Sequence, residues 1–346
     1  MKQDASVVIC AYTDKRWQDT LDAVESVMNQ SYEALEVVLV IDHNPELYQR
    51  FADVYQDNDK VVVVENDSVQ GLSGARNTGI RIAQGQLIGF LDDDATADSE
   101  WLGRLVAHCA DDDVIGAGGK VLPEWQGDFP AWFPAEFYWV VGCTYRGIED
   151  TVHEVRNPFG GCMVVKREAF EVFHGFRSGT GRVGDVPLGC EETEWCIRVR
   201  QTWKNRKFLY EPTATINHRI PANRTTWDYF YSRCYNEGIS KALLSNLLGA
   251  QDSLSSERSY VTVYLTSGVL FGLRDAIFKL DFDGLRRSYA IITGLATTGF
   301  GYLRGLMRIS QESAQADTSV DVVLPRIAST DEETPKRDLA EQPVQS

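Results

Sequence analysis

The sequence predicts an α/β fold, in which a mostly parallel sheet is flanked by helices and followed by a C-terminal helical appendage. Three observations support this class. Short, continuous apolar runs, typical of strands buried on both faces, recur in the first hundred residues. Stretches with helical spacing of apolar residues separate them, and such alternation implies crossover connections between parallel strands. A chain of 346 residues that is 43% hydrophobic can form a large core and an appendage.

The expected elements follow in chain order. The strands are the apolar runs at residues 6–11, 36–41, 60–64 and 87–91. One helix is expected over residues 20–30, and another over residues 72–85, where Gly85 would end it. In parallel sheets, ligands bind just beyond the carboxyl ends of the strands. The residues at these ends are Ala11, Tyr12, Asp42, Asp92, Asp93 and Asp94.

Charge and cysteine content limit the partners and the compartment. A formal net charge of −16 argues against nucleic acid, whose phosphates are bound by surplus Lys and Arg. With 24 Arg against 10 Lys and abundant Asp, the composition resembles that of salt-loving archaeal proteins, because high ionic strength screens surface repulsion. Seven cysteines without metal-binding spacing favour reduced thiols, and the N-terminus has no apolar leader. We therefore expect a cytoplasmic protein.

The stretch "FLDDDATAD" places three carboxylates directly after the expected strand at residues 87–91. A solvated turn would accommodate them, and so would a divalent cation that removes their mutual repulsion. Polar groups at the ends of neighbouring strands favour the cation. No GxGxxG follows the first strand and no Walker loop is present, so dinucleotide oxidoreductases and P-loop enzymes are disfavoured.

Six motifs together resemble the inverting glycosyltransferases of family 2, which have the Rossmann-like GT-A fold. They are "SVVICAYTD", "EVVLVID", "GLSGARNTGI", "GFLDDDATAD", "GCEETEWCIRVR" and "YEPTATINH", and the resemblance extends over residues 5–240. The resemblance implies a nucleotide-sugar donor, usually a UDP-sugar, and a divalent cation, Mn²⁺ or Mg²⁺. The chemistry agrees, since a cation neutralises the charge that develops on a diphosphate leaving group.

The resemblance also assigns roles at the donor site. Asp92 would face the ribose and the metal, Asp94 would bind the metal, Asp93 would support them, and His218 would complete the metal or diphosphate site, unless it is a structural histidine. Ala11 and Tyr12 would line the base, and Asp42 would accept a hydrogen bond from uracil. The family usually has two Asp at this strand end, but Ile41 stands in place of the first. Arg76 would reach the nucleotide; the alternative is an ordinary arginine on a helix surface.

An inverting transfer needs a carboxylate that removes a proton from the acceptor hydroxyl. Glu192 falls on the family's catalytic Asp, and Glu191 on the Glu before it. Because the change from Asp to Glu adds a methylene, either Glu191 or Glu192 is a candidate for the base. Alternatively, both are acids favoured by the dipole at the start of a helix.

The C-terminal part offers a second lead. We expect a catalytic domain over residues 1–240, a helical region over 241–310 and a disordered tail over 311–346. The apolar stretches at 260–273 and 289–302 are short for spanning a bilayer. Between Arg258 and Arg308 lie seven basic and three acidic residues, which suits an interfacial membrane patch. A buried helical hairpin is the alternative. Arg219, Arg224, Arg233 and Lys241 form a basic group that would meet the donor diphosphate or an anionic acceptor.

These expectations combine into one functional hypothesis. The chain is similar to archaeal transferases that build dolichol-linked glycans for N-glycosylation, and a hexuronic acid such as glucuronic acid is the narrower choice of sugar. It would act at the cytoplasmic face of the membrane on a lipid-linked acceptor. Two rivals are a dolichyl-phosphate sugar synthase and a non-catalytic nucleotide-sugar-binding protein on the same fold.

Overall fold

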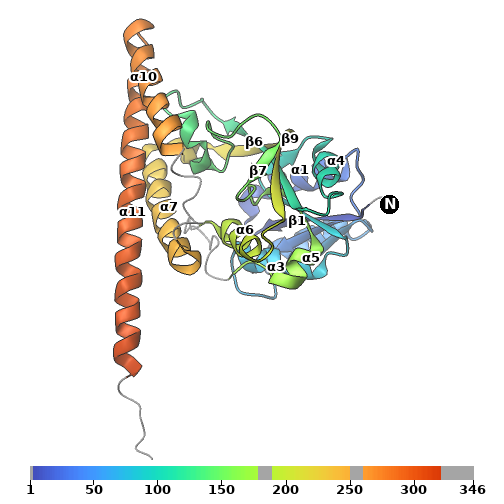
Figure 1. Cartoon of the computed structure of the whole chain (residues 1–346). Helices are drawn as coiled ribbons and strands as arrows, with labels where there is room; N and C mark the ends of the chain where they lie inside the picture. The colour runs from blue at the N-terminus through green and yellow to red at the C-terminus, as the bar shows by residue number, and fades with distance from the viewer. Residues whose placement is uncertain (1–2, 178–188, 250–259, 321–346) are drawn as a thin grey trace, which may run out of the picture. The chain divides into compact units, whose positions relative to one another are not determined.

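The computed structural model describes residues 3–177, 189–249 and 260–320, with side chains as far as residue 311. One sheet of nine strands lies at its centre, in the order β3-β2-β1-β4-β8-β6-β9-β5, with β7 paired to β9 (Figure 1). The strands are β1 (Ala5–Ala11), β2 (Glu36–Ile41), β3 (Val61–Glu65), β4 (Leu87–Asp92), β5 (Ala95–Ala97), β6 (Val114–Gln126), β7 (His153–Val155), β8 (Cys162–Lys166) and β9 (Lys207–Pro221).

The first half of the sheet is parallel, as expected. Strands β3, β2, β1 and β4 run in one direction, and all four lie within one residue of their expected bounds. The second half is mixed, because β8 runs antiparallel to both β4 and β6. The carboxyl ends of β1, β2 and β4 therefore meet at one edge, as the argument from sequence required.

Helices cover both faces of this sheet. In chain order, the helices of the described residues are α1 (Trp17–Met28), α2 (Pro45–Tyr55), α3 (Leu72–Ile82), α4 (Trp101–His108), α5 (Arg167–Phe173), α6 (Glu191–Thr202), α7 (Trp227–Leu248), α10 (Thr266–Phe278) and α11 (Phe282–Val320). Shorter helical turns are η1 (Asp14–Arg16), η2 (Ala135–Val141), η3 (Ala222–Thr225) and the π-helical η4 (Tyr260–Leu265).

Two helix boundaries differ from expectation by three residues, each for a local reason. The first helix begins at Trp17, three residues early, where the Trp17 ring stacks on Phe51 with centroids 4.3 Å apart. The second ends at Ile82 rather than Gly85. There the amide of Gln84 donates to Glu36 Oε1 at 2.6 Å, and that of Gly85 donates to Ser6 Oγ at 2.8 Å. Side chains of the sheet thus bind the chain that leaves α3.

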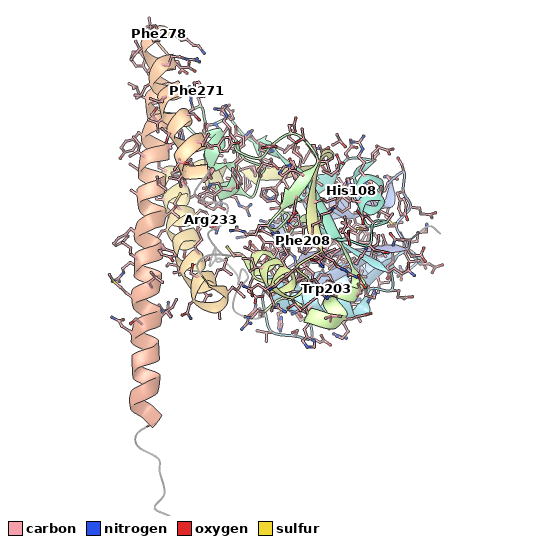
Figure 2. All side chains as sticks on the ribbon, in the orientation of Figure 1. His108, Trp203, Phe208, Arg233, Phe271 and Phe278 are labelled. Carbon is pink, nitrogen blue, oxygen red and sulfur yellow. The ribbon has the colours of Figure 1, made fainter. Side chains whose placement is uncertain are left out.

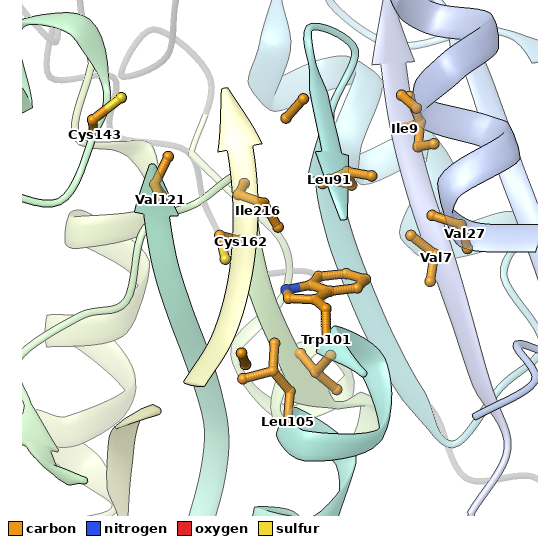
Figure 3. Close-up of a cluster of buried hydrophobic side chains, with 14 of the residues drawn as sticks. Val7, Ile9, Val27, Leu91, Trp101, Leu105, Val121, Cys143, Cys162 and Ile216 are labelled. Carbon is orange, nitrogen blue, oxygen red and sulfur yellow. The ribbon is translucent and has the colours of Figure 1, made fainter. Parts of the chain in front are cut away.

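The core lies on both sides of the sheet, which explains the continuous apolar runs. Alternate residues of β1 face opposite ways. Val7 and Ile9 pack with Val27 of α1 and with Trp101 and Leu105 of α4 (Figure 3). The opposite face of the sheet carries a second cluster, built on β1, β2, β4 and β8 and closed by the aromatic side chains of α5 and α6. All seven cysteines are free thiols.

The described residues up to Met307 form one compact unit, and a second unit begins at Arg308. Helix α7 runs unbroken through residue 240, where we expected the catalytic domain to end. Helix α11 continues to Val320, so the first ten residues of the expected tail are helical. The rest of that tail, from residue 321, lies outside the described residues.

Helices α10 and α11 form a hairpin that packs through small residues. Gly268, Gly272 and Ala276 form the buried face of α10, and a Cβ at Gly272 would overlap Ser288 and the backbone of Gly284 on α11. The large apolar side chains point outward instead: Ile277 is 67% exposed and Phe278 is 80% exposed. In a soluble hairpin, large apolar residues usually lie inside. Here the small residues lie inside and the large apolar residues lie outside.

Among the described residues, one helical stretch is long and apolar enough to cross a membrane, judged by length and composition alone. It is Tyr260–Phe278, with 19 residues, a mean hydropathy of 1.3 and 22% of its best window buried.

Candidate active site

A cavity of about 990 Å³ lies at the carboxyl edge of the sheet. Every residue to which the sequence assigned a catalytic, nucleotide-binding or metal-binding role lines it: Ala11, Tyr12, Asp42, Arg76, Asp92, Asp93, Asp94, Glu191, Glu192 and His218. They come from β1, β2, α3, β4, α6 and β9, together with the turns that follow these strands. The fold therefore brings together residues that are up to about two hundred positions apart in the chain.

Asp92, Asp94 and His218 form a compact group of possible metal ligands. One ligand atom from each lies within 4.8 Å of the other two. Strand β5 pairs with β9 so that Ala95 faces His218, and this register puts the histidine beside the acidic turn. Its Nε2 lies 3.1 Å from Asp94 Oδ1. Burial alone would lower the pKa of His218, but the Asp94 carboxylate raises it well above the usual range.

The acidic stretch is not the solvated turn that the sequence left open, because Asp93 and Asp94 are each only 4% exposed. Arg16 of η1 binds both, with Nη1 2.6 Å from Asp93 Oδ1 and Nη2 3.0 Å from Asp94 Oδ2. Burial raises the pKa of Asp93 to about 7 despite Arg16. Burial also opposes the charge of Asp94, yet His218 and Arg16 hold its pKa well below the usual range.

Arg76 connects the acidic turn to the glutamate pair. It is 3% exposed, so it is not an ordinary arginine on a helix surface. Its Nη2 lies 3.2 Å from Asp92 Oδ1, and its Nη1 donates to Glu191 Oε1 at 2.9 Å. The rings of Phe90 and Phe176 lie 5.7 Å from its guanidinium carbon. Burial disfavours this charge, but Glu191 and Asp92 raise the pKa of Arg76 above its ordinary value.

The glutamate pair begins α6, directly after Cys190, whose φ of 77° turns the chain into the helix. The two carboxylates differ in their partners. Glu191 is ion-paired to Arg76, whereas no Lys or Arg among the described residues forms an ion pair with Glu192. Burial, followed by the charge of Glu191, raises the pKa of Glu192 to about 7. Burial likewise raises the pKa of Glu191, while Arg76 opposes the shift.

At the other end of the cavity, Asp42 is held by three donors. Asn66 Nδ2 donates to its Oδ1 at 2.6 Å, His43 Nδ1 lies 2.9 Å from the same oxygen, and the Gly71 amide donates to its Oδ2 at 2.9 Å. The ring of Tyr12 lies in the same part of the cavity, with the guanidinium carbon of Arg16 5.9 Å from its centroid. This end offers a fixed acceptor and an aromatic surface.

The comparisons with known proteins agree with this geometry. The sequence profile of glycosyl transferase family 2 matches residues 6–173. A glucosyl-dolichyl phosphate glucuronosyltransferase from Haloferax volcanii is 35% identical over 303 residues, which cover 87% of this chain and 96% of the relative. This chain belongs to glycosyl transferase family 2. It is a glycosyltransferase, as the six motifs predicted.

Two further comparisons bear on the fold and the relatives of this glycosyltransferase. The mannosyltransferase PcManGT from Pyrobaculum calidifontis, solved with GDP-Man and Mn²⁺, superposes with a TM-score of 0.56 at 16% identity and 88% coverage of both chains. GalNAc-T7, solved with UDP, GalNAc and Mn²⁺, gives a TM-score of 0.50 at 18% identity, covering 72% of this chain and 54% of the other. At these identities the likeness shows the GT-A fold alone.

Three contributors to the site were missed in the sequence. Arg16, Asn66 and Gly71 all line or support the cavity, and each follows shortly after a strand of the parallel half. Their position beyond a strand end was the available signal. One of the four residues assigned to a basic group does not belong to it: Arg219 turns away from the cavity to bind Asp19 and Asp22 of α1 at 2.7 Å. Adjacent residues of a strand face opposite ways, so Arg219 cannot share the face of His218.

Proposed function

We propose that this glycosyltransferase moves a hexuronic acid, such as glucuronic acid, from a UDP-sugar to a dolichyl phosphate-linked saccharide, with inversion, in N-glycosylation of surface proteins. The observation that carries the reaction type is a single cavity with a metal-ligand group at one point and, at another, the partly buried Glu192, which forms no ion pair with a Lys or Arg of the described residues. The name of the Haloferax relative supports the sugar and the acceptor.

The ligand group suits a divalent cation of a particular kind. Two carboxylates and one imidazole form a mixed oxygen and nitrogen set, which fits Mn²⁺ better than Mg²⁺, because Mg²⁺ prefers oxygen ligands alone. Asp93 Oδ2, beside this group, is buried without a hydrogen-bond partner among the described residues. We assign Asp92, Asp94 and His218 as the ligands. When bound, such a cation would neutralise charge on the departing diphosphate.

Glu192 is our choice for the base. It accepts the proton of the acceptor hydroxyl while that oxygen forms a bond to the anomeric carbon and the bond from this carbon to the diphosphate breaks. Glu191 is less suited, because Arg76 holds its carboxylate at 2.9 Å. A base should be ionised yet avid for a proton near neutral pH, and a pKa of about 7 meets both conditions. Arg76 keeps Glu191 and Asp92 in place.

The end of the cavity that carries Asp42 and Tyr12 suits a nucleobase, but these two side chains do not distinguish uracil from guanine. The Asp42 carboxylate can accept from a ring N–H of either base, and Tyr12 offers an aromatic face to both. We propose UDP from the resemblance of the motifs.

We further propose that the protein binds the cytoplasmic face of the cell membrane as a peripheral or monotopic protein. The exposed apolar residues of α10 and α11 supply the surface that enters lipid. The basic side chains contribute less than their number suggests. Arg274 and Lys279 both bind Asp275, Arg286 binds Asp283, and Arg287 binds Asp281. Apolar burial would therefore dominate attachment.

The proposal is tested with purified protein, Mn²⁺ and a panel of donors: UDP-glucuronate, UDP-glucose, UDP-N-acetylglucosamine and GDP-mannose. Each is combined with a glucosyl polyprenyl phosphate or with bare polyprenyl phosphate, and products are read by mass spectrometry. We expect UDP-glucuronate and the glucosylated lipid to give product. Transfer to the bare lipid phosphate would identify a sugar synthase instead, and transfer from GDP-mannose would overturn the choice of UDP.

A further inference from the structure

One face of α7 carries a row of polar side chains along the cavity. Tyr229, Arg233, Glu237 and Lys241 recur at every fourth residue, and all four line the cavity. Residues four apart share one face of a helix, so this row extends for about 18 Å at 1.5 Å per residue. The opposite face is closed, since Gly238 packs against the backbone of α11 at Thr298.

The row starts beside the metal-ligand group and leads away from it. Arg224, in the turn before α7, has Nη1 3.6 Å from Asp94 Oδ2. Along the row, Arg233 Nε donates to the Val140 carbonyl at 3.4 Å, and its charge lowers the pKa of Glu191 against the effect of burial. Lys241 Nζ lies 3.3 Å from Glu237 Oε1. Two cations therefore line the cavity on the side of α7, near the glutamate pair but apart from the metal ligands. Figure 2 labels Arg233 on this helix.

The wall beyond the row is apolar and belongs to the hairpin. Tyr260, Tyr264 and Leu265 come from η4, which leads into α10, and Leu295 and Tyr302 come from α11; all line the same cavity. Tyr260 is fixed, because Trp139 Nε1 donates to its hydroxyl at 3.0 Å and this hydroxyl donates to the Glu136 carbonyl at 2.5 Å. Leu295 is 39% exposed, and other large apolar side chains of the hairpin, including Phe271 and Phe278 (Figure 2), are exposed as well.

We propose that Arg233 and Lys241 bind the phosphate of the lipid-linked acceptor, and that its isoprenoid chain leaves the cavity over the wall formed by Tyr260, Tyr264 and Leu295. This inference rests on the proposed function, since it concerns the acceptor of that reaction. An amphiphile with an anionic head and an apolar chain matches a cavity whose cations adjoin an apolar wall. The sugar attached to the phosphate then lies toward Glu192, and the chain lies toward the surface proposed to enter the membrane.

The competing occupant of these cations is the carboxylate of a hexuronic acid on the donor. This carboxylate presents an anionic oxygen, as the acceptor phosphate does, but a hexuronic acid has no apolar chain that would need the apolar wall. The donor diphosphate is a poorer match, because the metal-ligand group and Arg224 lie at the start of the row and not along it.

A soluble probe tests the phosphate site directly. Titration calorimetry measures the binding of farnesyl phosphate to the full chain with Mn²⁺ and UDP bound, for wild type, Arg233→Gln, Lys241→Gln and the double variant. Each charge-assisted hydrogen bond contributes about 1.5–3 kcal/mol, so each single change should weaken binding by roughly tenfold or more. Arg206→Gln is the control, because Arg206 lies outside the cavity and binds Glu168 of α5. UDP affinity in all variants reports correct folding.

Turnover separates the possible outcomes. With the glucosyl polyprenyl phosphate, the Arg233 and Lys241 variants should raise KM for the acceptor about tenfold and leave hydrolysis of the UDP-sugar within about twofold of wild type. An unchanged acceptor KM together with unchanged farnesyl phosphate binding would overturn the site. A raised KM for UDP-glucuronate but not UDP-glucose would assign the cations to the donor instead. If wild type uses no lipid acceptor, the proposed function fails, and farnesyl phosphate binding still decides the site.

Discussion

At the scale of single residues, the adjacent glutamates that begin α6 have different surroundings. Arg76 neutralises Glu191, while Glu192 lies partly buried beside that pair with no cation bound to it among the described residues. The sequence predicted that one of the two is the base but could not choose between them, because the choice depends on which carboxylate Arg76 reaches from α3. Likewise, the acidic motif predicted Asp92 and Asp94 as ligands, but nothing local to it indicated that Arg16 binds Asp93 and Asp94.

Replacing Glu192 by Gln should reduce kcat by about 10²-fold or more, the usual scale for losing a positioned general base, and should leave the affinity for UDP nearly unchanged. Steady-state transfer kinetics and UDP titration measure the two effects. Glu171→Gln, an exposed change on α5, is the control. If Glu191→Gln causes the larger loss of kcat with intact UDP binding, the base is the other glutamate.

The raised pKa of Glu192 predicts a pH profile. A base acts in its ionised form, so kcat should fall as the pH drops below about 7, by about tenfold per unit once well below it. The residual kcat of Glu192→Gln should lack this limb, since the amide does not titrate. Both profiles are measured at saturating donor, acceptor and Mn²⁺. A wild-type kcat that stays constant down to pH 5 would contradict the assignment.

A glycine before β8 makes room for the acidic turn. A Cβ at Gly161 would overlap the carboxylate of Asp92. We expect Gly161→Ala to displace Asp92 and to weaken Mn²⁺-dependent UDP binding by about tenfold or more, because one ligand of the cation moves. Calorimetry with and without Mn²⁺ measures this change. Gly127→Ala is the matched control, since its Cβ would meet only Ala222 at an ordinary 3.8 Å. Equal UDP affinities in the two variants would show that the close approach is tolerated.

At the scale of elements, the parallel half of the sheet was predictable and the C-terminal helices were only partly so. Continuous apolar runs predict buried strands, and four strands of the structure lie within one residue of the bounds predicted in this way. The sequence did not predict that α7 lines the cavity. This helix carries both the cavity-lining row and the face that packs on α11, and it crosses the expected domain boundary at residue 240. The apolar residues of α10 were compatible with a lipid-facing or a buried helix, and the sequence did not indicate that the glycines of α10 face inward and its large apolar side chains outward.

Because α10 and α11 pack through small residues, a large side chain at Gly272 should lower the stability of the protein. Gly272→Leu would force a bulky side chain against Ser288 and the backbone of Gly284, and overpacking of this kind costs about 1–3 kcal/mol in the free energy of unfolding. The neighbouring Phe271→Leu changes an exposed side chain and should alter stability little. Chemical denaturation of both variants measures the difference. Equal stabilities would show that α10 and α11 do not pack as described.

At the scale of the whole molecule, the proposed membrane attachment rests mainly on the exposed apolar side chains of the hairpin, because the composition is acidic. Changing Ile277, Phe278 and Phe282 to Ser removes three side chains that are at least 67% exposed. Because burying one such side chain contributes about 1.5–3 kcal/mol, vesicle binding should fall by well over tenfold, while Mn²⁺-dependent UDP binding persists. Flotation with anionic liposomes at low and high salt measures this. Binding that persists in the triple variant and is lost in high salt would indicate electrostatic attachment.

The central claim is that this glycosyltransferase uses a cation and Glu192 to move a sugar to a lipid-linked acceptor with inversion. The most direct measurement is the anomeric configuration of the product formed from UDP-α-D-glucuronate and a glucosyl polyprenyl phosphate, read by NMR, with and without a chelator. The account predicts a β-linked glucuronosyl product that requires a divalent cation and is nearly absent with Asp94→Ala. An α-linked product, or equal yield after chelation, would contradict it.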